Sequence, residues 1–90
     1  MTISQRVQAE EYALVTAYVL AKVESGKDAV LEMIKKLPGV RSAVSTLGPY
    51  DLHIEVAFTT TENLDDFIYD KMRRIPGITE TVTMIAFEAI

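Results

Sequence analysis

Apolar and polar side chains alternate from residue 14 to residue 23, in the segment LVTAYVLAKV. Val15, Ala17 and Val19 fall on one side of this alternation, and Thr16 and Tyr18 fall on the other. A period of two in a segment rich in valine predicts a long strand with two different faces.

The period then changes to that of a helix. Apolar residues recur three or four positions apart at Val30, Met33, Ile34 and Leu37, and the stop signal Pro38-Gly39 follows. We therefore expect a helix of about three turns over residues 27–37.

The second part of the chain repeats this order of periods. Residues 40–47 and 50–58 predict two strands, and the turn Gly48-Pro49 between them is short enough for an antiparallel hairpin. The hydroxyls of residues 59–61 can cap a second helix, whose apolar stripe is Leu64, Phe67, Ile68, Met72 and Ile75. This helix should stop at Pro76-Gly77, and residues 78–87 predict a fourth strand.

An internal repeat supports this order of elements. The segment KKLPGV at residues 35–40 recurs 38 residues later as RRIPGI at residues 73–78, so each half is one βαβ unit. Such crossovers are right-handed in nearly all cases. Two units joined by a hairpin therefore predict an α+β, ferredoxin-like βαββαβ fold, with an antiparallel four-stranded sheet and both helices on one face.

This fold leaves the other face of the sheet uncovered. We expect that face to carry polar and apolar side chains together: Thr16, Tyr18, His53, Glu55, Thr81 and Thr83 with Leu14, Leu20, Ile85 and Phe87. A homodimer packing sheet on sheet would remove this mixed surface from water. Residues 1–12 are polar, and we interpret them as an N-terminal arm ahead of a domain over residues 13–90.

Composition and charge narrow the class of protein. Ninety residues, 49% of them hydrophobic, suit one small domain, which usually needs disulfides, a metal or a partner chain for stability, and the lack of cysteine excludes disulfides. The lack of cysteine and of a long apolar run favours a soluble, cytoplasmic protein that does not enter a membrane. A net charge of −4 works against a large phosphate-contact surface, so we expect no direct binding of nucleic acid.

The residues that usually carry catalysis are few. The chain has one histidine, no cysteine and no Gly-rich phosphate loop, so we expect no enzyme, no catalytic residue, no cofactor and no metal site. His53 could act as a general base or haem ligand, although a lone strand histidine is more often a packing or interface residue. The basic pairs 35–36 and 73–74 fit helix C-termini, and Met33, Met72 and Met84 are expected to fill the core.

The turn LGPYDL at residues 47–52 offers a candidate site for a small zwitterion. Gly48 permits close approach of the backbone, Tyr50 adds an aromatic wall, and Asp51 places a carboxylate at a strand end. Asp51 and turn carbonyls can accept hydrogen bonds from an ammonium group, while turn N–H groups and threonine hydroxyls donate to a carboxylate. The alternative is an ordinary hairpin turn in which Asp51 accepts hydrogen bonds from nearby backbone N–H groups.

Three segments together resemble a known family. AYVLAKVESGKD, LPGVRSAVSTLGPYDL and IPGITETVTMIAF are similar to the Lrp/AsnC ligand-binding domain, also called the regulation of amino-acid metabolism (RAM) domain. The resemblance covers residues 17–87. Its most specific part is L-P-G-V, then G-x-Y-D beginning eight residues after Val40, then I-P-G-I-x-x-T-x-T.

The resemblance implies a dimeric α/β barrel of facing sheets, with dimers assembling into higher oligomers. It also implies that a small-molecule effector, commonly an amino acid, binds in a cleft between dimers, at Gly48, Tyr50, Asp51, Thr81 and Thr83. Pro49 departs from the charged residue often seen in this turn, which alters the loop that meets the ligand.

Full-length members of the family carry an N-terminal helix-turn-helix domain, which twelve polar residues cannot supply. The chain therefore resembles a stand-alone effector-binding and oligomerisation domain that acts in transcription regulation without binding DNA itself. A full-length Lrp/AsnC paralogue is a candidate partner, and the arm could equally be the remnant of a linker.

Two other interpretations stay open. One is a small ferredoxin-like monooxygenase-type enzyme, with His53 and Tyr18 in a cavity of the sheet, and the other is a purely structural oligomer. The place of the pocket discriminates between the first of these and the effector-binding interpretation.

Overall fold

The computed structural model describes residues 14–87, so the expected arm over residues 1–12 lies outside the described residues. The elements follow the predicted order: β1 (Val15–Val23), α2 (Lys27–Lys35), β2 (Val40–Ser45), β3 (Leu52–Phe58), α3 (Thr61–Asp66) and β4 (Ile78–Ala86). α3 continues directly into a π-helical segment, Phe67–Met72. We call α3 and this segment together the second helix.

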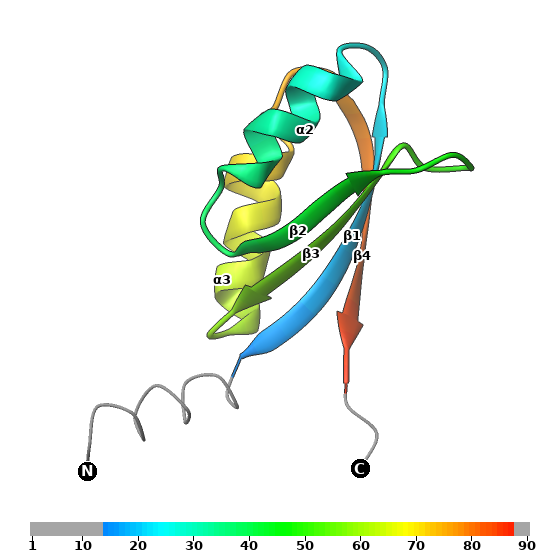
Figure 1. Ribbon diagram of the computed structural model, residues 1–90. Helices are drawn as coiled ribbons and strands as arrows, with labels where there is room; N and C mark the ends of the chain where they lie inside the picture. Colours follow the sequence, from blue (N-terminus) through cyan, green and yellow to red (C-terminus); the bar gives the residue numbers. More distant parts are fainter. Residues whose placement is uncertain (1–13, 88–90) are drawn as a thin grey trace, which may run out of the picture.

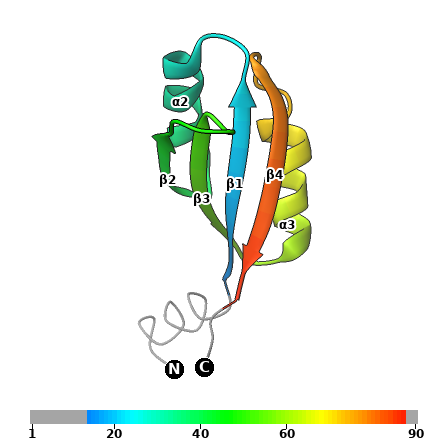
Figure 2. The same cartoon turned by 90° about the vertical axis from the view of Figure 1, so that its right-hand side faces the viewer.

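The four strands form one antiparallel sheet in the order β2-β3-β1-β4. α2 and the second helix cover one face of it (Figure 1). Figure 2 looks onto the other face, with the four strands side by side and the helices behind them. The predicted ferredoxin-like α+β fold is confirmed.

The core lies between the helices and the sheet. Alternate residues of the two central strands are fully buried: Ala17, Val19 and Ala21 in β1, and Leu52, Ile54 and Val56 in β3. The helices pack against them through Val30 and Ile34 of α2 and through Leu64, Phe67, Ile68 and Met72 of the second helix. Met72 thus fills the core as predicted, but Met33 and Met84 are 47% and 46% exposed, so the prediction is wrong for both.

The second helix differs from a regular α-helix. The Thr60 Oγ1 atom accepts a hydrogen bond of 3.0 Å from the Asn63 N–H and so caps its first turn. Near its end, the Arg73 N–H donates to the Ile68 carbonyl, five residues back, at 3.0 Å. This wide turn is the mark of a π-helix and changes which side chains share a helix face.

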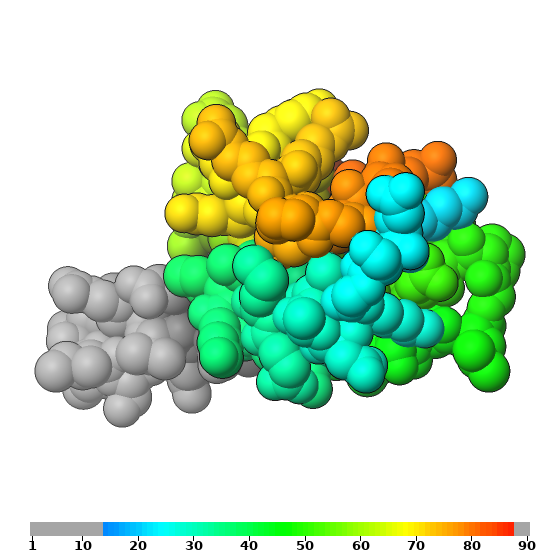
Figure 3. Space-filling view, turned by 90° about the horizontal axis from the view of Figure 1, so that it is seen from above, coloured from blue at the N-terminus to red at the C-terminus, as the bar shows by residue number. Residues whose placement is uncertain are grey.

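The repeated Pro-Gly turns have the same backbone structure in both halves. Gly39 and Gly77 have φ angles of 90° and 100°, in the region that favours glycine. Their carbonyls accept hydrogen bonds from the Ala57 N–H at 2.9 Å and the Glu24 N–H at 2.7 Å, which ties each outer strand to a central strand. Figure 3 shows the segments around residues 24 and 77 against each other at one end of the molecule.

A β-bulge follows each of these turns. Val23 pairs with Ile78 and Lys22 pairs with Glu80, so Thr79 is an extra residue in β4. In the same way Val56 pairs with Val40 and Glu55 pairs with Ser42, so Arg41 is an extra residue in β2. An extra residue reverses the direction of every side chain that follows in the strand.

The bulge in β4 changes which residues of this strand lie on the uncovered face of the sheet. Thr81 and Thr83 pair with the buried residues Ala21 and Val19, and residues directly opposite each other share a face. Thr81, Thr83 and Ile85 therefore lie on the helix side, and their predicted place on the uncovered face is wrong. Val82 and Met84 lie on the uncovered face instead, beside Leu20 and Tyr18.

Candidate functional site

The G-x-Y-D turn lies at one end of the sheet, where β2 passes into β3. The Thr46 N–H donates to the Asp51 carbonyl at 2.8 Å, and the Thr46 hydroxyl donates to the Tyr50 carbonyl at 2.8 Å. The Lys27 ammonium donates to the Thr46 carbonyl at 3.3 Å, which links the base of the turn to the start of α2. The tip at residues 47–49 is exposed and projects beyond the sheet (Figure 1).

Asp51 extends the pairing of the two central strands. Its N–H donates to the Ala21 carbonyl at 2.9 Å, and its Oδ2 atom accepts a hydrogen bond of 2.8 Å from the Val23 N–H. The carboxylate thus has a structural role, as the ordinary-turn alternative expected, but its donor lies on β1, 28 residues away, and not near Asp51 in the sequence. A carboxylate accepts several hydrogen bonds, so this contact uses only part of its capacity.

Tyr50 connects the turn to β4. Its hydroxyl donates to the Glu80 Oε2 atom at 3.1 Å, and the Lys22 Nζ atom lies 3.9 Å from that oxygen and 5.4 Å from the centre of the Tyr50 ring. The hydrogen bond to Glu80 raises the pKa of Tyr50, and slight desolvation and the Glu80 charge raise it further. Tyr50, Lys22 and Glu80 therefore form a polar cluster at this end of the uncovered face.

The two threonines lie on the other side of β4. Thr81 is half-buried and lines a groove of about 360 Å³, together with Arg73, Ile78, Thr79 and Glu80. Thr83 is exposed. Gly48, Tyr50 and Asp51 thus share one turn, but a single chain does not gather them with Thr81 and Thr83 around one cavity.

Three polar residues near the candidate site were not predicted: Lys22, Glu80 and Arg73. Lys22 and Glu80 are charged residues within strands, a pattern that indicates a polar contact on an otherwise apolar surface. Arg73 was interpreted only as a complement to the helix dipole, yet its guanidinium lies 4.7 Å from the centre of the Tyr69 ring and lines the groove beside Thr81.

His53 lies in the middle of the uncovered face and is half-buried. Its ring meets the Tyr18 ring edge-on, with 5.7 Å between the centroids. Neither groove that we describe in this structure is lined by His53. Among residues 14–87, no three histidine or carboxylate side chains come together as potential metal ligands, and no helix there is long and apolar enough to cross a membrane.

Comparisons with known proteins match the chain to regulators. A regulator of Pyrococcus abyssi, named as an uncharacterized HTH-type transcriptional regulator, is 34% identical over 79 residues, which are 83% of this chain and 53% of that protein. The HTH-type transcriptional regulator FL11 of Pyrococcus horikoshii is 33% identical over 73 residues, 80% of this chain and 48% of FL11. The chain thus spans about half the length of these curated relatives.

Solved structures give the same fold. FFRP-DM1 superposes with a TM-score of 0.77 at 40% identity, over 81% of this chain and 99% of the other. The regulator NMB0573 of Neisseria meningitidis superposes with a TM-score of 0.78 at 18% identity, over 100% of this chain and 58% of the other. The family profile described as the Lrp/AsnC ligand binding domain matches residues 16–90. The chain therefore belongs to the Lrp/AsnC ligand-binding domain family.

Proposed function

We propose that the chain is an amino-acid effector-binding and oligomerisation domain that acts in transcription regulation without binding DNA itself. The observation that carries this proposal is the construction of the G-x-Y-D turn. Its base is held by backbone hydrogen bonds through Thr46 and Asp51, while its tip is exposed. A fixed turn of this kind can present N–H groups, carbonyls and a carboxylate to a zwitterion at little entropic cost.

The effector site in this proposal is completed by a second copy of the chain. Gly48, Tyr50 and Asp51 lie in the turn, whereas Thr81 and Thr83 lie on the other side of β4, so one copy contributes the turn and its neighbour the threonines. The NMB0573 structure is that of a complex with L-Met. That protein shares only the fold, but its ligand is of the class proposed here.

Self-association is supported by the surface of β4. Val82 and Met84 on the uncovered face are 37% and 46% exposed, and Ile85 on the helix side is 41% exposed, a large apolar surface for one strand of a small domain. We propose that a homodimer covers the sheet face and that dimers assemble further, with a full-length Lrp/AsnC protein as a candidate partner. The net charge of −4 supports a role that leaves DNA contacts to such a partner.

A monooxygenase-type function is the second candidate, because the Tyr18–His53 pair would lie between the sheets of a dimer. His53→Ala separates the two functions. It should leave effector binding intact in the regulatory account and abolish turnover in the enzymatic one.

The direct experiment is thermal stability in the presence of each of the twenty amino acids. A ligand present at 100 times its dissociation constant should stabilise the native state by about 2.7 kcal/mol. Asp51 also supports the fold, so Thr83→Val is the cleaner variant, because it removes one exposed hydroxyl and keeps the side-chain shape. We expect this variant to weaken the response to the active amino acid without changing stability in its absence. If no amino acid raises the melting temperature, the proposal is wrong.

A further inference from the structure

A second and larger groove lies at the opposite end of the sheet from the G-x-Y-D turn. Its volume is about 460 Å³, within the range of small-molecule sites, and it lies between the Pro38-Gly39 turn, the end of β3 and the second helix. β3 begins at Leu52 beside the G-x-Y-D turn and ends at Phe58 beside this groove, so about 20 Å of strand separates the two places. We call it the Gly39 groove.

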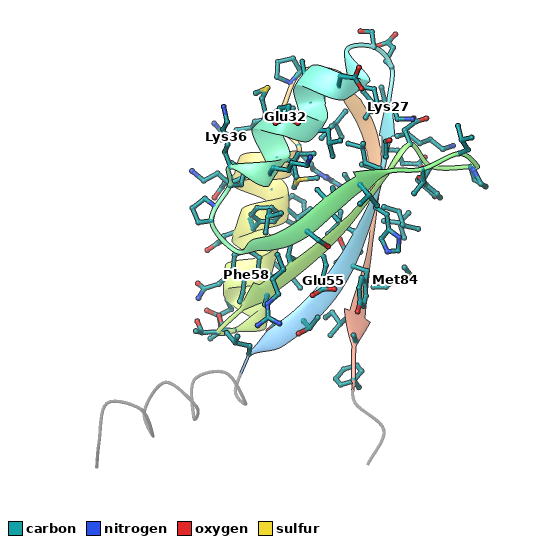
Figure 4. The ribbon with its side chains drawn as sticks, in the orientation of Figure 1. Lys27, Glu32, Lys36, Glu55, Phe58 and Met84 are labelled. Atoms are coloured by element: carbon teal, nitrogen blue, oxygen red, sulfur yellow. The ribbon has the colours of Figure 1, made fainter. Side chains whose placement is uncertain are left out.

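Two aromatic rings contribute to the apolar part of the Gly39 groove, together with Leu14, Pro38 and Ala57. The Phe58 and Phe67 rings lie 5.0 Å apart between centroids, and Phe67 is almost fully buried. Phe58 lies at the end of the sheet near the second helix (Figure 4). A Cβ atom at residue 39 would approach the Phe58 ring to 2.5 Å, so glycine at this position leaves the space that the ring occupies. The aromatic surface is therefore set by the packing of the free chain.

Charged side chains from the second helix line the same groove: Asp66, Asp70 and Lys71. In a regular α-helix, residue 71 would point about 140° away from residue 66. Residue 70, four positions after residue 66, lies on the same side in either kind of helix, and the wide π-helical turn brings residue 71 to that side as well. Two carboxylates against one ammonium leave this rim negative, and among residues 14–87 neither aspartate makes an ion pair.

We infer that the Gly39 groove binds a small organic cation, namely a primary ammonium group attached to an apolar body. The aromatic rings would hold the apolar part, and an ammonium beside aromatic faces is attracted by their electron-rich surface. Asp66 and Asp70 would accept its hydrogen bonds. An α-amino acid of the same side chain carries a carboxylate as well, which these aspartates repel, so the ligand class differs from the effector class proposed for the turn.

The probe for this inference is 2-phenylethylammonium, with neutral 2-phenylethanol and zwitterionic phenylalanine as matched compounds. Binding is followed by the backbone amide NMR signals of the full chain during titration at millimolar concentrations. We expect saturable shifts at Gly39 and Asn63 with the ammonium compound, and at least about tenfold weaker affinity for the other two, equivalent to 1.4 kcal/mol.

The variant test is Asp66→Asn together with Asp70→Asn, with Asp65→Asn as control, since Asp65 is exposed on α3 and does not line the groove. The double variant should lose the preference for the ammonium compound over 2-phenylethanol, and the control should keep it. Equal affinity for all three compounds, no saturable shift, or shifts at residues 48–51 in place of Gly39 would each overturn the inference. Because the groove and the turn are far apart, the first two outcomes leave the effector proposal untouched, and shifts at residues 48–51 would assign the binding to the turn instead.

Discussion

The two βαβ halves begin from nearly the same short sequence and end in different surroundings. KKLPGV and RRIPGI form the same turn, the same backbone bond to a central strand and the same bulge one residue later. Gly77 is enclosed by the Ser25 carbonyl, Val23 and Val30, whereas Gly39 contacts the Phe58 ring and borders an open groove. Local sequence therefore determines the turn, and more distant residues determine whether it becomes core or binding surface.

The outer strands differ in the same way. Ala43 of β2 and Thr81 of β4 are equivalent in the repeat and both lie on the helix side of the sheet. Ala43 is 6% exposed, because α2 packs against β2, while Thr81 is only half-buried beside the smaller groove. β4 is thus the outer strand whose helix side is less covered.

The largest effects are expected where the halves are alike. Ile34 and Met72 are equivalent in the repeat and both are fully buried. Ile34→Ala and Met72→Ala should each lower the free energy of unfolding by about 2–5 kcal/mol, because each leaves a cavity in the core. Urea denaturation at fixed protein concentration measures this, with exposed Met33→Ala as the control that should change little.

A smaller difference is expected between the two glycines. Gly39→Ala should lower the free energy of unfolding by about 1–2 kcal/mol through backbone strain. It should add little steric cost, because the Phe58 ring can shift toward the groove. Gly77→Ala should cost at least about 1 kcal/mol more, because the new Cβ would lie 2.8 Å from the Ser25 carbonyl oxygen, a backbone atom that moves less easily. Equal losses in denaturation would show that the surroundings of the two turns are equivalent, and a larger loss for Gly39→Ala would reverse the predicted order.

The outer strands give a third comparison. Ala43→Thr should destabilise the protein by about 1–3 kcal/mol, because it adds volume and a hydroxyl beneath α2. Thr81→Ala should stay within about 0.5 kcal/mol of the unmodified chain, because the site is only partly covered. Thermal unfolding of both variants would contradict this picture if Thr81→Ala were the more damaging change.

The smallest effect concerns the contact that joins the two halves. The hydrogen bond to Glu80 raises the pKa of Tyr50, so it favours the folded state below the unfolded pKa of tyrosine and is lost as pH rises through the folded pKa. Tyr50 is at the surface, so stability should change little with pH in this range. Glu80→Gln should move the Tyr50 pKa back toward its ordinary value, measured by NMR titration, whereas an unchanged pKa would mean that the bond is not formed in solution.

Much of the fold could be predicted from periodicity and from the repeat. The strands, both helices, the capping threonines and the hairpin occupy nearly their expected positions, because each depends on neighbouring residues. The facing of β4 could not be predicted by counting alternate residues, because the bulge at Thr79 reverses it. The π-helical turn at Phe67–Met72 could not be predicted either, because the apolar residues of this segment have ordinary α-helical spacing.

The candidate sites were harder to predict, because they depend on contacts between residues that are far apart in the sequence. Gly48, Tyr50 and Asp51 lie within four residues of sequence, so their proximity was predictable, whereas the bond from the Val23 N–H of β1 to the Asp51 carboxylate was not. The Tyr50–Glu80 contact joins residues thirty positions apart, and the Gly39 groove combines Leu14 with the Pro38-Gly39 turn, the end of β3 and the second helix. Neither follows from a local pattern.

The central claim is that an amino acid binds between copies of this chain, and light-scattering mass over a series of protein concentrations tests it most directly. We predict a mass above that of the 10.0 kDa monomer and a change in the distribution of assemblies with at least one of the twenty amino acids, reduced in Thr83→Val. A chain that stays monomeric throughout, or an assembly whose mass and stability no amino acid changes, would contradict the claim.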